Sequence, residues 1–211
     1  MLKKDKHDGF FGGLYKRNET FLMLSTMIFL VSMFVGYAFS GVLDQVLGSV
    51  LGDLKRRLTE GELKLTTFSI FANNLKVAFL IYGGGLVLGL FTVFYLIVNG
   101  AFLGYAATKF PLGDFIIFTI PHGIPEIIGI VIAGAAGFRL ASCVMHILKD
   151  ITHIRSDISF TGQLKHVLEI HADEFVESLK LFGIAVVFLI IAAFIEANLS
   201  IPWGTYIRGV L

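Results

Sequence analysis

Long apolar stretches, separated by polar ones, dominate the chain. A membrane-spanning helix needs about 20 mostly apolar residues. Stretches of this kind occur at about 20–43, 68–98, 122–148 and 179–199, and the stretch 99–121 is apolar but interrupted. The pattern predicts an all-α integral membrane protein, a bundle of about five transmembrane helices flanked by amphipathic interfacial helices.

The stretch 99–121 does not fit a simple span. Lys109, Pro111, Gly113 and Asp114 interrupt it near its middle. One interpretation is a single span broken at the proline, and the other is two short half-helices packed inside the bundle. Irregular backbone at membrane depth is tolerated only where protein or a water-filled cavity covers it. We therefore expect a broken or re-entrant segment here.

Two polar stretches, 44–65 and 149–178, lie between the apolar ones. In the first, leucines recur at spacings of three and four, at Leu47, Leu51, Leu54 and Leu58. This spacing predicts an amphipathic helix that lies on the membrane or on the bundle. The stretch 149–178 mixes charged and apolar positions in a similar way, and we expect a second interfacial or cytoplasmic helix there.

Composition supports a membrane class and excludes others. The chain is 55% hydrophobic and 16% charged, with a mean hydropathy of +0.80, whereas a soluble protein carries about 25% charged residues. We expect one membrane-embedded domain, 20–211, after a polar segment, 1–19. A net charge of +1 without a basic stripe argues against nucleic acid as a partner. Cys143 is the single cysteine, so no intrachain disulfide can form.

The distribution of basic residues predicts an orientation. The segment 1–19 carries five Lys or Arg residues, which places it in the cytoplasm by the positive-inside rule. With five spans, 149–178 is then also cytoplasmic, and 44–65 and the carboxyl terminus lie outside; if 99–121 is re-entrant, everything after it has the opposite orientation. Four basic residues of the outer stretch argue against this orientation: Lys55, Arg56, Arg57 and Lys64. The expected location is the cell membrane, with several passes.

The best candidate for a functional centre is the sequence 121–139, PHGIPEIIGIVIAGAAGFR. Ionisable groups at membrane depth cost roughly 2.5–3.5 kcal/mol each on insertion scales, so they usually face a partner or a cavity. His122 and Glu126 are four residues apart and share one helix face. Arg139 follows Glu126 by 13 residues, about 220° around a helix, so it should pair with another helix or an exposed carbonyl end; the alternative is that its side chain snorkels to the interface. Candidate partners are Glu196 and Asp114.

Small residues predict close packing between helices. Gly85 and Gly89 have the GxxxG spacing that lets a second helix approach. The face of His122 and Glu126 continues in small residues at Gly129, Ala133 and Gly137. We therefore expect this face to point into the bundle.

Three hypotheses compete for His122 and Glu126. A zinc site would need a third ligand, such as His146 or His153. A proton or ion relay would connect the pair to Glu196. A buried hydrogen-bonded network that holds helices together needs no ligand. We favour the network and expect no metal and no cofactor.

Asparagines provide weaker signals. Asn73 and Asn74 are expected to open a long helix, one as its amino-terminal cap and the other as an interhelical donor. Asn99-Gly100 is typical of a turn after a span. The sequence contains no nucleophile elbow, no P-loop and no dinucleotide fingerprint, so we do not expect an enzyme.

The order of these motifs resembles the stage II sporulation protein M family. The resemblance covers roughly 15–200 and rests on Asn73-Asn74, Gly85, Gly89, Asn99-Gly100-xx-Leu103-Gly104, Pro121-His122-Gly123-xx-Glu126, Gly137-x-Arg139 and Glu196. Members of the family are small polytopic membrane proteins, usually with about five spans. In endospore formers the namesake recruits a peptidoglycan-degrading pair within a membrane complex.

The resemblance implies a non-enzymatic membrane scaffold. Such a protein would bind other membrane or envelope proteins and form homo-oligomers in the lipid bilayer. The alternative is a small transporter or channel, with His122, Glu126 and the broken 99–121 segment lining a polar site at the midplane.

Overall fold

The computed structural model describes residues 9–60, 66–152 and 160–210. Within these ranges the chain forms seven α-helices and one 3-10 turn. They are α1 (Phe10–Ala38), α2 (Ser40–Thr59), α3 (Thr67–Gly83), η1 (Gly84–Val87), α4 (Leu90–Ala107), α5 (Leu112–Thr152), α6 (Phe160–Asn198) and α7 (Ser200–Val210). The prediction of an all-α membrane protein is confirmed.

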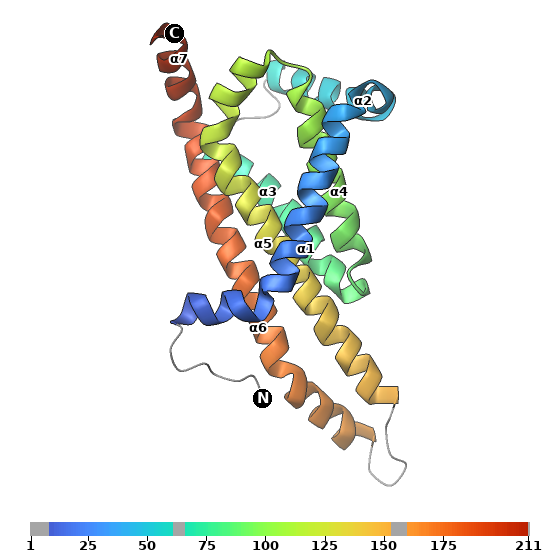
Figure 1. Cartoon of the computed structure of the whole chain (residues 1–211). Helices are drawn as coiled ribbons and strands as arrows, with labels where there is room; N and C mark the ends of the chain where they lie inside the picture. Colours follow the sequence, from blue (N-terminus) through green and yellow to red (C-terminus); the bar gives the residue numbers. More distant parts are fainter. Residues whose placement is uncertain (1–8, 61–65, 153–159, 211) are drawn as a thin grey trace.

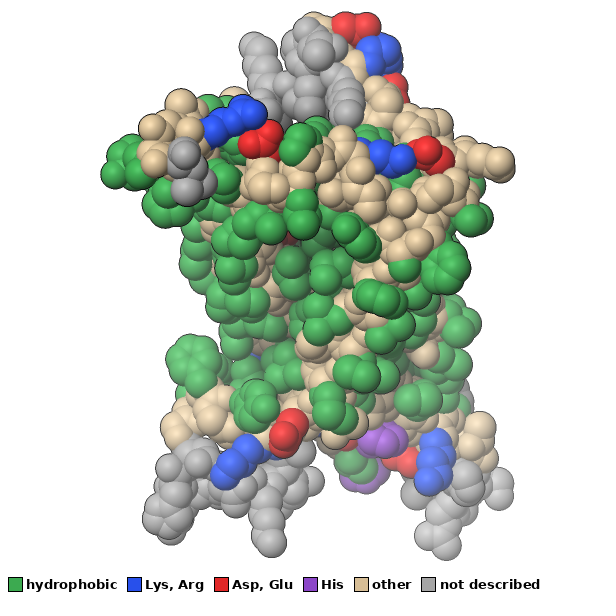
Figure 2. Space-filling view, turned by 45° about the horizontal axis from the view of Figure 1, so that its top comes forward, with side chains coloured by type: hydrophobic (Ala, Val, Ile, Leu, Met, Phe, Trp, Pro, Cys, Tyr) green, Lys and Arg blue, Asp and Glu red, His purple; other side chains and the backbone are tan. Residues whose placement is uncertain are grey.

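Five of these helices, α1, α3, α4, α5 and α6, are long and apolar enough to cross a membrane. They run back and forth along one direction, and α2 and α7 lie at the end opposite the start of α1 (Figure 1). Hydrophobic side chains cover the middle of the molecule, and charged side chains gather at its two ends (Figure 2). The chain is therefore a multi-pass membrane protein in a lipid bilayer.

The spans differ from the predicted ones between 68 and 121. The stretch 68–98 is two helices, because η1 reverses the chain between α3 and α4. Gly89 has a φ of +82°, a left-handed conformation that glycine adopts without strain. The segment 99–121 is neither a broken span nor re-entrant: it comprises the end of α4, a short connection at 108–111 and the start of α5. Five spans result, with boundaries other than those expected.

Gly85 and Gly89 lie in the turn between α3 and α4 and not along one helix face, but α5 approaches both of them, and an added Cβ at Gly89 would lie 3.5 Å from Ala141 Cβ. Gly85 is still required by packing, because an added Cβ would lie 2.3 Å from the Gly137 carbonyl oxygen of α5. The close helix pair forms instead at Gly100 and Gly104 of α4. Added Cβ atoms there would lie 2.2 Å from Ser32 Oγ and 1.9 Å from the Met33 carbonyl oxygen of α1.

Helix α5 occupies the centre of the bundle and packs against α1, α3, α4, α6 and α7. Its small residues make this possible: Ala133 is fully buried, and an added Cβ at Gly129 would lie 2.8 Å from Leu189 Cδ2 of α6. At Gly137 it would lie 2.7 Å from Thr92 Oγ1 of α4. These three positions are therefore tightly packed, as is every residue of α5 from Ala133 to Ala141.

Helices α5 and α6 also extend beyond the other spans. At 1.5 Å per residue, the 41 residues of α5 reach about 60 Å, twice the roughly 30 Å hydrocarbon core of a bilayer. Because Gly85 contacts α5 at Gly137 and Leu140, residues 142–152 lie past the α3–α4 turn, beside the first turns of α6 (Figure 1). We call 142–152 and 160–174 the hairpin arm. The stretch 149–178 is thus not a separate interfacial helix, since most of it continues directly into the last span.

Candidate functional site

Two ionisable residues of the 121–139 sequence, His122 and Glu126, lie close to a third ionisable residue on another helix. His122 and Glu126 of α5 and Glu196 of α6 each place a nitrogen or carboxylate oxygen within 4.8 Å of the other two. All three are half-buried. Glu196 was one of the residues that the relay hypothesis required, and the structure brings it to this position. We call these three residues the carboxylate cluster.

A serine of α7 holds the His122 ring. Nδ1 of His122 and Oγ of Ser200 share a hydrogen bond of 2.8 Å, and the Ser200 hydroxyl donates to the Ile195 carbonyl oxygen at 3.3 Å. A serine hydroxyl has one proton to donate, so Ser200 accepts from Nδ1 when it donates to Ile195. In the neutral ring, Nε2 of His122 is then left as an acceptor.

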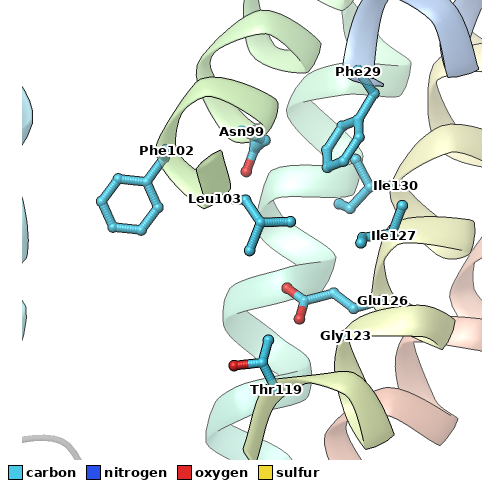
Figure 3. A pocket seen from close by; sticks show the side chains of 9 residues that line it. All are labelled: Phe29, Asn99, Phe102, Leu103, Thr119, Gly123, Glu126, Ile127 and Ile130. Atoms are coloured by element: carbon cyan, nitrogen blue, oxygen red, sulfur yellow. The ribbon is translucent and has the colours of Figure 1, made fainter. Parts of the chain in front are cut away.

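Glu126 also faces a cavity of about 170 Å³ between α1, α4 and α5. Its carboxylate points toward this space, with Asn99 above it and Thr119 below it, among apolar side chains (Figure 3). The lining residues are Phe29, Asn99, Phe102, Leu103, Thr119, Gly123, Glu126, Ile127 and Ile130. The cavity gives Glu126 a mostly apolar environment with few polar partners.

Among the described residues, neither Glu126 nor Glu196 forms an ion pair or a side-chain hydrogen bond. Two carboxylates close to each other in a poorly solvated place repel when both are ionised, so a shared proton or a bound cation would stabilise them. One imidazole and two carboxylates are also a donor set that a divalent metal accepts. The arrangement can therefore hold a proton or a cation, and it provides no activated nucleophile.

Arg139 lies elsewhere, in a second buried group. Its Nη2 is 2.8 Å from Oε2 of Glu177 on α6, and Nε of Arg17 on α1 is 2.5 Å from the other oxygen. Glu177 and Arg139 are buried, and Arg17 is about one-third exposed. We call these residues the arginine cluster. The expected partners of Arg139, Glu196 and Asp114, are wrong; Asp114 pairs with Arg208 of α7 at 3.1 Å.

The asparagines occupy positions other than those predicted. Asn73 and Asn74 are inside α3, whose cap is Thr66, where Oγ1 accepts from the Ser69 N–H at 3.2 Å. Asn73 is exposed, and Nδ2 of Asn74 is buried without a hydrogen-bond partner among the described residues. Asn99 is inside α4, not in a turn, and Nδ2 donates to the Tyr95 carbonyl oxygen at 2.7 Å.

Sequence reasoning missed Glu177, Arg17 and Ser200. Glu177 was assigned to a polar interfacial stretch, although it is followed at once by the apolar run of α6. The available signal was charge balance, because a buried Arg139 requires a buried acid. Ser200 follows Glu196 by four residues, which is the spacing of one helix face, but α7 was not predicted.

Comparison with known proteins agrees with the motif order. The family model described as stage II sporulation protein M matches residues 25–201. Two uncharacterized proteins of Methanocaldococcus jannaschii are similar to the chain. One is 28% identical over 196 residues, covering 87% of this chain and 83% of its own length. The other is 33% identical over 144 residues, covering 66% of this chain and 73% of its own length. No solved structure shows significant similarity.

Proposed function

Because this chain belongs to the stage II sporulation protein M family, we propose that it is a membrane scaffold that binds partner proteins through the hairpin arm. The observation that carries the proposal is the extension of α5 and α6 past the α3–α4 turn. Helices α5 and α6 are longer than a bilayer crossing requires, so the arm is not needed for spanning. In this proposal the chain has no catalytic role of its own.

The surface of the arm suits a protein partner. Exposed apolar side chains lie on it among charged ones: Met145, Leu148, Leu168 and Ile170 are each 48–55% exposed. Charged neighbours include Lys149, Asp150, Lys165 and Glu169. Apolar anchors within a polar surround are the composition of protein interfaces. Since the arm shares an end with the start of α1 (Figure 1), the positive-inside rule supports a cytoplasmic location for both.

Site-specific photocrosslinking in native membranes tests the proposal. A photoreactive amino acid at Met145 or Leu168 should give discrete protein adducts. The same group at Phe34, 70% exposed on the apolar part of α1, should react with lipid. Adducts between two copies of the chain would support self-association instead of a different partner. If the arm positions yield no more protein adduct than Phe34 does, the scaffold proposal is wrong.

The carboxylate cluster supports a second candidate function, the movement of protons or cations. The specific observation is that Glu126 and Glu196 meet without a cationic partner among the described residues. Purified chain in sealed vesicles should then carry a proton or cation current down an imposed gradient. A double change of Glu126→Gln and Glu196→Gln should abolish the current, and Glu169→Gln on the exposed arm should not. Vesicles that show no current above protein-free vesicles would exclude this function.

A further inference from the structure

The hairpin arm contains a second group of potential metal ligands, far from the carboxylate cluster along α5 and α6. His146, His171 and Glu174 each place a nitrogen or carboxylate oxygen within 4.8 Å of the other two. Nδ1 of His146 lies 3.0 Å from Oε2 and 3.2 Å from Oε1 of Glu174. Nε2 of His171 lies 2.8 Å from Oδ2 of Asp150. We call these four residues the arm cluster.

The spacing of these residues along the two helices is suited to a shared ion. His146 and Asp150 are four residues apart on α5, and His171 and Glu174 are three apart on α6. Each pair therefore lies on one helix face, and the two faces oppose each other. The imidazole rings stack at 5.7 Å between centroids. Side chains on facing helices build metal sites in helical bundles, and a histidine and a carboxylate three residues apart on one helix, as at His171 and Glu174, recur in such sites.

We propose that the arm cluster binds one divalent transition-metal ion, with zinc as the best-matched ion, and that the ion joins α5 to α6. Imidazole nitrogen and carboxylate oxygen are zinc ligands, at about 2.0–2.2 Å from the ion. Two such donors on one ion are about 3–3.5 Å apart, close to the His146–Glu174 separation of 3.0 Å.

Burial favours an ion over four separate surface groups. His171 and Glu174 have side chains that are 11% and 19% exposed, while His146 and Asp150 are about half exposed. One side of the cluster is thus fixed by packing, and the other opens to solvent as an entry path. Asp150 also holds the His171 ring, and such a carboxylate–histidine contact orients metal-binding imidazoles. The proposal departs from our expectation from sequence that the chain binds no metal.

A binding measurement on the full chain tests the proposal directly. The chain is purified in detergent, stripped with a chelator and titrated with Zn²⁺, and bound ions are counted per chain. We expect the wild-type chain to bind an ion that His146→Gln and His171→Ala lose, with affinity lower by more than the 10- to 100-fold that second-sphere changes cause. His166→Ala, an exposed histidine on the same helix, should retain it. Equal binding by all four proteins would overturn the proposal.

The carboxylate cluster must be separated from the arm cluster in this test. The same titration of a chain with His122→Ala and Glu126→Gln should still show the ion that His146→Gln removes. If the double change abolishes zinc binding and His146→Gln does not, the ion belongs to the carboxylate cluster and the proposal is wrong. His146→Gln is the safer variant because its side chain is half exposed, so it should fold as the wild type does.

The single cysteine supplies a second readout that does not count ions. Cys143 is buried one turn before His146, and its Sγ donates to the His171 carbonyl oxygen at 3.6 Å. Joining α5 to α6 by an ion should reduce local opening and slow the alkylation of Cys143 by a maleimide. Zinc should slow this reaction in the wild type and leave its rate unchanged in His146→Gln. A wild-type rate that zinc does not change would contradict the joining role. Neither readout depends on the scaffold proposal.

Discussion

Helices α5 and α6 form two buried polar groups with opposite charge balance. The arginine cluster joins Glu177 to two arginines, Arg139 and Arg17, whereas the carboxylate cluster joins two acids to one histidine. Removing one partner of a buried ion pair destabilises a fold, whereas like charges that lie close together repel each other. From this difference we expect a structural role for the first cluster and a ligand or proton role for the second.

The largest effect should come from Glu177→Gln, which leaves Arg139 buried without its counter-charge. Removing one partner of a buried ion pair typically costs about 3–5 kcal/mol. We expect a loss of unfolding free energy in this range, measured by denaturation in mixed micelles. Glu169→Gln is the matched control, because its carboxylate is 64% exposed and pairs with the exposed Lys165. Equal stability of the two variants would remove the structural role of the arginine cluster.

The same chemical change in the other cluster should have the opposite sign. Glu126→Gln removes a half-buried carboxyl that has no cationic partner among the described residues, so the chain should keep its stability or gain about 1 kcal/mol. The denaturation experiment used for Glu177→Gln measures it. A clear loss of stability would mean that Glu126 belongs to a supporting hydrogen-bonded network, which was our expectation from sequence.

A smaller effect is expected where the carboxylate cluster meets α7. Ser200→Ala removes the hydrogen bond between Oγ and Nδ1 of His122 and should cost about 1 kcal/mol. Thr205→Ala on the same helix provides the control, since its exposed hydroxyl donates only to the Ile201 carbonyl oxygen. If both changes have the same effect, Ser200 does not orient His122.

The smallest effect on stability is expected from an exposed ion pair outside the bundle, with which both clusters can be compared. Asp44 of α2 lies 2.7 Å from Lys109 and also accepts from the Tyr105 hydroxyl. The hydrogen bond from Lys109, and then that from Tyr105, lower the pKa of Asp44 below its usual value of 3.8. The stability contributed by ionised Asp44 is therefore present above that usual value. It is lost as the pH falls through the lower pKa of the folded state.

The change Asp44→Asn should flatten the acid side of the pH–stability profile by a small amount, because exposed ion pairs contribute little. Thermal unfolding measured from about pH 2 to about pH 6, a range that brackets the usual carboxyl pKa values, tests this change in the profile. Asp53→Asn, also on α2 and paired with Arg56, controls for the loss of one exposed charge. Overlapping profiles for wild type and Asp44→Asn would show that this contact does not contribute.

The sequence predicted the class of fold because hydropathy and span length are local properties. It placed His122, Glu126, Gly129, Ala133 and Gly137 on one inward face, because helical spacing decides that without knowledge of neighbours. The cluster partners required tertiary information. The acids predicted for Arg139 were wrong because Glu177 lies in a stretch with many exposed charges. Its burial follows from the packing of α6 against Arg139 of α5 and Arg17 of α1.

The turn between α3 and α4 was missed for a different physical reason. Polar residues usually mark a turn, but the chain reverses here through Gly83, Gly84 and Gly85 with apolar residues on both sides. Average hydropathy therefore does not fall at the turn, and 68–98 looks like one span. Three consecutive glycines were the signal, because such a run is a poor helix former. Conversely, the polar Asn99 predicted a turn because polar residues usually mark turns, although it lies inside α4.

Helix α5 contains two prolines, Pro121 and Pro125, at the level of the carboxylate cluster. Each lacks an N–H, so the carbonyl oxygens one turn earlier, at Ile117 and Pro121, receive no intrahelical hydrogen bond from them. This end of α5 is its easiest place to bend, while the glycine- and alanine-lined remainder is clamped between neighbours. The two prolines thus confine any bending of α5 to the end beside α7, away from its tightly packed middle.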